Sequence, residues 1–369
     1  MHPKSGLRWH LALVVLVQGM LLVGKIAMAE DQPVRKEIAV ELTPGPSTLV
    51  DTFPPALKCA GKAWTREQVM GLFGLSFCFS LNDGGGPLQQ TSNIDWSTFF
   101  SMLKYLDVEC EVITASLNGA QKVPPEQMKQ LKEDAWKKVK VSIDRGVPAI
   151  AWSPMTVSQR DAKQNAFEWA LIVGYEEATG SYIVRHRSSP KAFAAPHDQI
   201  GFVDPVQWFC VIVIGAPKED IDVKVRQRAV LEQAVALGKG DKIGSMDAAA
   251  GGKKAFALWR KAIRDGSVNW EGVPQHARFL ENTRTAAGAF LENLAADFQG
   301  ADRQGLLDAA KFYRQEAAVA TALIAAGEKK DVEQSVKQLD EVAAAEEKAI
   351  EQLESVVKHT ATSTKNTTK

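Results

Sequence analysis

Residues 168–186, EWALIVGYEEATGSYIVRH, form the stretch that decides the fold. Two apolar runs in it, residues 170–173 and 182–184, are rich in the β-branched and aromatic side chains that favour strands. Thr179-Gly180-Ser181 stands between the runs and has the residue types that a tight turn requires. The stretch therefore predicts a β-hairpin, and a glutamate and a histidine occupy its two ends.

Gly174-Tyr175 follows the first apolar run. With this pair the hairpin resembles the His-bearing hairpin of papain-like cysteine peptidases of the bacteriocin-processing type, and that of the acyltransferase-like butirosin biosynthesis protein H family. Those families place a His before the apolar strand, a Gly-Tyr pair after it, and an Asp or Asn at the end of the next strand. The resemblance implies that Glu168 stands at the His position and His186 at the acid position, so the two residue types have exchanged places.

The same resemblance implies a nucleophile at the N-terminus of the first helix, where the helix dipole and an imidazole stabilise a thiolate. A short helix is expected over residues 51–61, because Asp51 or Thr52 supplies a cap, prolines follow, and Gly61 ends it. Thr52 is the best match to the nucleophile position. A threonine hydroxyl has no comparably low pKa, so thiolate chemistry is not expected there.

Cys59 is the alternative nucleophile. It lies near the C-terminal end of the same expected helix, where the dipole opposes a thiolate, and a buried or disulfide-bonded thiol is the more common role. Two interpretations of Glu168 and His186 stay open: an ordinary cross-strand pair, or an acid–base pair in exchanged positions. Exchange places the imidazole where the orienting group belongs, too far from the helix end to deprotonate a nucleophile there.

Residues 1–29 have the pattern of a secretory signal peptide. Lys4 and Arg8 precede an apolar run over residues 11–23, and Ala27-Met28-Ala29 offers a cleavage site. A lone membrane anchor is the main alternative, but the run is short and is interrupted by Gln18. We therefore expect an exported protein, in the periplasm or outside the cell, without a membrane association beyond the signal peptide.

Charge and cysteine usage limit the partners. The chain carries 44 basic and 44 acidic side chains, so nothing in its charge predicts binding to nucleic acid or to an anionic membrane. Its 4 cysteines include no CxxC pair, and the histidines show no ligand spacing, so neither a metal nor a cofactor is expected. Four thiols permit three fully paired disulfide patterns, and the sequence selects none of them.

A chain of 369 residues predicts two domains, and the composition changes to helix-forming residues after Pro217. The expected order is a leader segment over 30–50, a papain-like α+β domain over 51–217, a helical bundle over 218–358, and a disordered polar tail over 359–369. In the first domain we expect helices over 96–106 and 125–144 and strands over 110–117, 149–152 and 208–214. The resemblance adds a buried strand after Met70-Gly71-Leu72.

The last predicted helix has a regular apolar seam with a 4-3 spacing, formed by Val332, Val336, Leu339, Ala343, Ile350, Leu353 and Val357. Glu346 stands where the pattern asks for an apolar residue. The seam predicts docking onto another helix, either in this chain or in a partner that associates through residues 330–357. A turn at His276 and a helix near Arg284 are similar to the helical half of bacterial relatives of the resembled family.

These patterns favour three functions. The first is a degenerate cysteine-peptidase homologue that binds a peptide or acyl ligand without cleaving it. The second is an active thiol hydrolase or acyltransferase with Cys59 as nucleophile and His186 as base. The third is a cell-envelope interaction protein that acts through its C-terminal helices.

Overall fold

The structure is a computed structural model that describes residues 34–45, 47–81, 96–117, 122–162, 167–189, 191–201, 208–241 and 250–366. The expected signal peptide lies outside these ranges. Within them, no helix combines the length and the apolar character needed to cross a bilayer.

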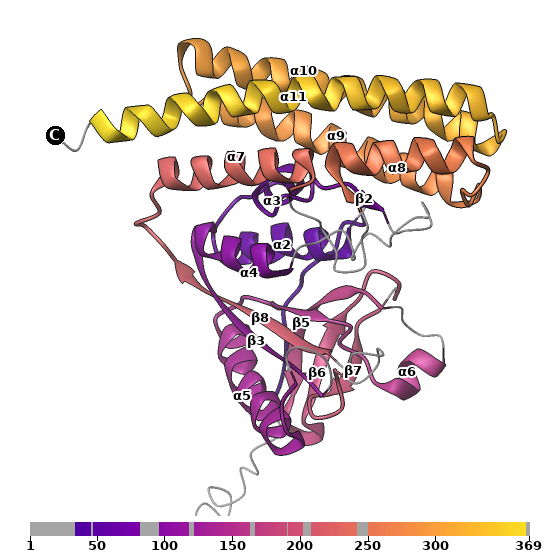
Figure 1. The fold of residues 1–369 in the computed structure, drawn as a ribbon. Helices are drawn as coiled ribbons and strands as arrows, with labels where there is room; N and C mark the ends of the chain where they lie inside the picture. The colour runs from indigo at the N-terminus through magenta and orange to yellow at the C-terminus, as the bar shows by residue number, and fades with distance from the viewer. Residues whose placement is uncertain are drawn as a thin grey trace, which may run out of the picture.

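Layers of sheet and helix are stacked on one another (Figure 1). An antiparallel sheet carries α5 (Pro125–Asp144) on the face turned away from the other helices. The short helices α2 (Thr48–Cys59), α3 (Arg66–Leu72) and α4 (Trp96–Met102) separate the sheet from a layer of long C-terminal helices. The α+β class with a helical C-terminal part is thus confirmed.

The sheet has seven strands in the described residues, and every pairing is antiparallel. Along the sheet these are β3 (Val108–Ser116), β8 (Trp208–Pro217), β4 (Ala149–Trp152), β5 (Trp169–Glu176), β6 (Ser181–Arg185) and β7 (Phe193–Pro196), and β1 (Arg35–Glu37) pairs with β5. Smaller elements are η2 (Leu103–Tyr105), α6 (Val157–Asp161) and η3 (Glu177–Thr179). The strands predicted over 110–117, 149–152 and 208–214 are confirmed to within a few residues, and α5 has both predicted ends.

The β5–β6 hairpin forms as the sequence predicts. Gly180 ends its turn with a left-handed φ of 59°, a conformation that glycine adopts without steric cost. Gly174 allows β1 to lie close, because a Cβ there would come within 2.2 Å of the Lys36 carbonyl oxygen. Part of the expected leader segment is therefore a strand of the sheet.

Helix α2 starts at Thr48, earlier than the predicted start at Asp51. Ser47 is the N-cap residue, with extended φ and ψ but no capping hydrogen bond from its side chain. Asp51, the residue that resembled a cap, instead accepts a hydrogen bond from the Gly45 N–H at 2.7 Å. The expected N-terminal position of Thr52 is therefore wrong, because Thr52 lies in the second turn.

Helix α3 begins with a capping box, in which Thr65 and Gln68 exchange side-chain and backbone hydrogen bonds. The strand expected after Met70-Gly71-Leu72 is wrong, since residues 73–77 form turns. Only β2 (Ser80–Leu81) follows, and it pairs with β9 (Ala250–Gly251) beside the C-terminal helices.

The C-terminal layer consists of α7 (Val223–Lys239), α8 (Gly252–Arg264), α9 (Gly272–Ala295), α10 (Gly300–Glu328) and α11 (Val332–Asn366). The seam of α11 packs within this chain against α7, α8 and α10, and its Leu339 and Leu353 are fully buried. Association with a partner or with a second copy through residues 330–357 stays a prediction.

The last helix does not stop at residue 358 but continues to Asn366, so the expected disordered tail is helical up to that residue. The Thr360 hydroxyl donates to the carbonyl oxygens of Val356 and Val357, both at 3.0 Å, which binds the polar end to the preceding turn. Residues 367–369 lie outside the described ranges.

A single hydrophobic cluster joins the sheet, the short helices and the C-terminal layer. It contains Phe53 of α2, Val69 of α3, Ile212 of β8 and Leu291 of α9. A second cluster lies between α5 and the sheet, and a third fills the far end of the helical layer. The predicted boundary near Pro217 therefore falls between parts of the chain that share one core.

Candidate functional site

Glu168 and His186 lie together at one end of the β5–β6 hairpin. A Glu168 carboxylate oxygen, Oε2, is 3.7 Å from His186 Nδ1, and the His186 side chain is fully buried. The Ser188 hydroxyl lies between them, 2.9 Å from His186 Nδ1, and donates to Glu168 Oε2 at 3.2 Å. The pair that the sequence singles out is thus in contact, with a serine added.

This geometry differs from that of a catalytic triad. In a triad the imidazole lies between the nucleophile and the acid, and each uses a different ring nitrogen. Here the carboxylate and the hydroxyl both approach Nδ1 of His186. The arrangement orients the imidazole, but Glu168, His186 and Ser188 do not form a proton relay to a nucleophile.

Charged side chains surround the pair. Arg187 binds Glu168 at 3.2 Å and lies 3.9 Å from Asp51, whose side chain is 3% exposed. Arg66 binds the other oxygen of Asp51 at 2.9 Å. Burial raises the pKa of the Asp51 carboxyl, and Arg66 and the Gly45 N–H oppose that rise.

The main chain of residues 43–45 is held against these charges. Arg187 donates to the Gly45 carbonyl oxygen and Arg66 to that of Thr43, both at 2.8 Å. The remaining gap, lined in part by Thr48, has no room for a water molecule. Within the described residues, this segment therefore closes the Arg187 side of the hairpin site.

Both threonines of α2 are buried and hydrogen-bonded. The Thr52 side chain is buried, and its hydroxyl donates to the Leu49 carbonyl oxygen at 2.6 Å. Thr48, in the first turn, accepts a hydrogen bond from the Trp169 N–H at 3.2 Å. The N-terminus of α2 thus contacts the start of the hairpin through Thr48 rather than Thr52.

Cys59 lies at the other end of α2. A helix rises 1.5 Å per residue, so Cys59 is about 16 Å along the axis from Thr48, the residue of α2 that contacts the Trp169 N–H. Burial raises the pKa of its thiol, which makes the thiolate scarcer at neutral pH. The structure does not bring Cys59 and His186 together.

The other thiols are no better suited to catalysis. All four cysteines fall in the described ranges and are thiols rather than disulfides. Burial raises the pKa of Cys110 and that of Cys210 to about 12. In the described ranges, no group of three or more His, Cys, Asp or Glu side chains is placed to hold a metal ion.

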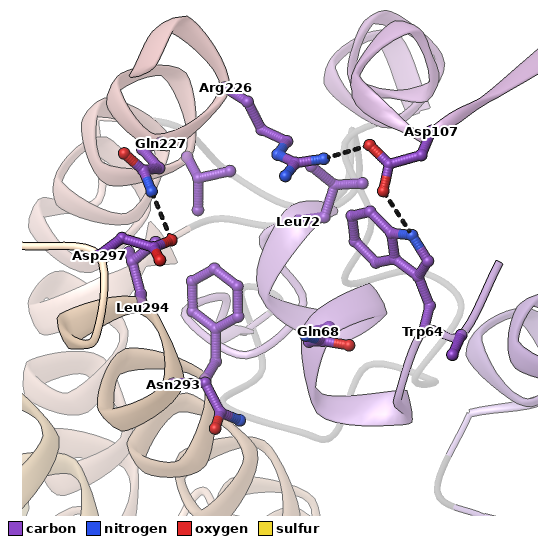
Figure 2. A pocket seen from close by; sticks show the side chains of 12 residues that line it. Trp64, Gln68, Leu72, Asp107, Arg226, Gln227, Asn293, Leu294 and Asp297 are labelled. Carbon is purple, nitrogen blue, oxygen red and sulfur yellow. Dashed lines mark hydrogen bonds and ion pairs between the residues drawn. The ribbon is translucent and has the colours of Figure 1, made fainter. Parts of the chain in front are cut away.

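A second hollow opens between α3, α7 and α9 (Figure 2). We call it the junction cleft; it has a volume of about 180 Å³ and is lined by Ala63, Trp64, Gln68, Leu72, Asp107, Arg226, Gln227, Val230, Phe290, Asn293, Leu294 and Asp297. Unlike the hairpin site, it is open to a ligand.

The sequence pattern indicates Glu168 and His186 but not the residues that fix them. Arg187 and Ser188 follow His186 directly, and a polar cluster just after a buried strand was the available signal. The junction cleft had no local signal, because its residues come from segments far apart in the sequence.

Comparison with known proteins adds no assignment. No protein-family model matches the chain, and no curated protein is significantly similar to it.

Proposed function

We propose that this is an exported protein with a papain-like domain that binds a peptide or acyl ligand and does not cleave it. The observation that supports the proposal is the shared approach of Glu168 and Ser188 to Nδ1 of His186, whereas the acid and the nucleophile of a triad contact different ring nitrogens. The distance of Cys59 along α2 and the closure of the site by residues 43–45 support the same conclusion.

Turnover and binding can be measured in one experiment. The chain from residue 30 onward is incubated with a mixed peptide library and with acyl thioesters, and free and retained compounds are analysed by mass spectrometry. We expect retention of some compounds and no turnover above the protein-free control. Turnover that disappears in Glu168→Gln or His186→Gln but persists in Glu177→Gln, a glutamate at the other end of the hairpin, would contradict the proposal.

The thiol alternative has its own test. Brief treatment with iodoacetamide at neutral pH, followed by mass spectrometry, gives the alkylation rate of Cys59. Because burial raises the pKa of this thiol, we expect a rate equal to or below that of glutathione. A much faster rate would restore the thiol hydrolase.

A further inference from the structure

We propose that the junction cleft binds the N-terminal residue of a peptide, with an apolar side chain inside the cleft and the α-ammonium group at Asp297. This inference rests on the proposed binding function and names its site and ligand class. Three features of the cleft carry it: its size, its prearranged wall and its charge.

The size suits one side chain. A volume of about 180 Å³ compares with cavities of about 150 Å³ that hold a benzene molecule, and pockets for whole cofactors or drug-sized ligands begin near 300 Å³. The apolar lining comes from Leu72, Val230, Phe290 and Leu294. A branched or aromatic side chain therefore fits, whereas a long acyl chain would extend beyond the apolar surface.

One wall is fixed by internal bonds (Figure 2). The Trp64 indole N–H donates to Asp107 Oδ2 at 3.1 Å, and Arg226 Nη1 donates to Asp107 Oδ1 at 2.7 Å. The Arg226 guanidinium also lies over the Trp64 ring, 5.5 Å from its centroid. The wall needs little ordering when a ligand enters, which favours binding.

The charge of the cleft favours a cation. Arg226 neutralises Asp107. Asp297 has a different partner, since Gln227 donates its neutral amide to Asp297 Oδ2 at 2.7 Å. In the described part of the chain no lysine or arginine pairs with Asp297, so its negative charge is available to an ammonium group at the rim of the cleft.

Two amides complete the rim. Gln68 of α3 and Asn293 of α9 line the same hollow from neighbouring helices. The Gln68 amide oxygen already accepts from the Thr65 N–H at 2.8 Å, so Gln68 offers its NH2 group to a peptide C=O, and the Asn293 amide can bind the N–H or the C=O of a peptide group. An acyl ligand offers neither this N–H nor a positive charge, and the observations therefore favour the peptide.

Short peptides test the assignment. Calorimetric titration compares Phe-Gly-Gly amide, its N-acetyl form, Ser-Gly-Gly amide and free phenylalanine. The comparison separates the contributions of the apolar side chain, the ammonium group and the peptide groups to the affinity. We expect Phe-Gly-Gly amide to bind best. Acetylation should weaken binding about fivefold, the effect of a partly exposed ion pair. Equal affinity for the acetylated peptide would overturn the ammonium site, and equal affinity for free phenylalanine would overturn the peptide assignment.

Variants locate the ligand. Asp297→Asn keeps the acceptor for Gln227 and should weaken Phe-Gly-Gly amide about fivefold without affecting the acetylated form. Asp161→Asn, on α6 and away from the cleft, is the matched control. Leu294→Trp fills the cleft and should abolish binding at an unchanged melting temperature; if it fails to fold, Asp297→Asn decides.

The outcomes separate the two proposals. Peptide binding that survives both Leu294→Trp and Asp297→Asn would move the site elsewhere and leave the proposed function intact. If no peptide from the library or the titration series is bound, and no acyl compound either, the proposed function itself fails.

Discussion

Arg284 and Glu346, 62 positions apart in the sequence, meet at 2.7 Å with both side chains fully buried. Arg284 also binds Glu316 at 2.9 Å and the Ser76 carbonyl oxygen at 2.7 Å. The cluster therefore joins α9, α10 and α11 to the turn that follows α3. It explains the glutamate in the apolar seam of α11, because Glu346 is the counter-charge of a buried arginine.

One arginine faces two carboxylates in this cluster. Burial, and then the neighbouring Glu346, raise the pKa of Glu316 well above its usual range, which favours the protonated form of Glu316. The cluster is then neutral overall, which reduces the cost of burying it. Because the pKa of Glu316 is raised in the folded state, protonated Glu316 contributes to the free energy of unfolding. That contribution is complete below pH 4.5 and is lost as the pH rises through the pKa of the folded state.

We therefore expect Glu316→Gln to change the free energy of unfolding by less than about 1 kcal/mol at pH 7, because the amide replaces a protonated acid of the same shape. The double variant Glu316→Gln/Glu346→Gln leaves Arg284 buried without a counter-charge and should lose about 3 to 5 kcal/mol. Urea denaturation of both variants and of wild type measures these changes. A double variant no less stable than Glu316→Gln would show that Arg284 needs no carboxylate.

Local patterns predicted much of the fold. Both ends of α5 were predictable, because Pro125 stands at the first helical position and Gly146, with a φ of 82°, follows the last turn. The start of α2 was not predictable. Asp51 has the residue type of an N-cap, whereas Ser47, the observed N-cap residue, makes no side-chain capping hydrogen bond. Because the helix was expected to start at Asp51, the nucleophile position was assigned to Thr52, which lies in the second turn, and not to a residue of the first turn.

Local sequence patterns could not predict contacts between distant segments of the chain. Glu346 was visible as a polar residue in an apolar seam, and Arg284 only through a weak resemblance. Nothing in either segment indicates that the two form a pair, because helix packing in three dimensions sets that contact. The same holds for the Gly45 main chain, which Arg66 and Arg187 bind from different parts of the sequence.

His276 makes the stability of the helical layer depend on pH. Its ring is buried beside Trp259 and Phe79, at centroid distances of 5.2 Å and 5.9 Å. Burial lowers the pKa of His276 from 6.5 to about 3. A lowered pKa means that the contribution to stability is complete above pH 6.5 and is lost progressively as the pH falls towards 3.

From pH 7 to pH 5 this histidine should therefore lower the free energy of unfolding by about 2 kcal/mol. His276→Phe, which keeps a ring between the two aromatic neighbours, should remove that part of the decrease. Urea denaturation at a series of pH values measures it, and His359→Gln on the exposed end of α11 serves as the control. Equal pH slopes for His276→Phe and wild type would mean that His276 is accessible to protons in the folded state.

The closed hairpin site depends on the absence of a side chain at Gly45. A Cβ there would lie 2.3 Å from the Arg66 guanidinium carbon and 2.4 Å from Asp51 Oδ1. Gly45→Ala should therefore displace Arg66 from Asp51 and leave a buried carboxyl group without its main charged partner. We expect a loss of about 1 to 3 kcal/mol in the free energy of unfolding.

Ser47→Ala is the matched control for Gly45→Ala, since the Ser47 side chain makes no capping hydrogen bond and its removal should cost less than about 0.5 kcal/mol. Both variants are compared by urea denaturation at pH 7. If Gly45→Ala proves as stable as Ser47→Ala, residues 43–45 have room to move. The hairpin site would then be open to ligands, and closure by this segment could no longer support the absence of catalysis.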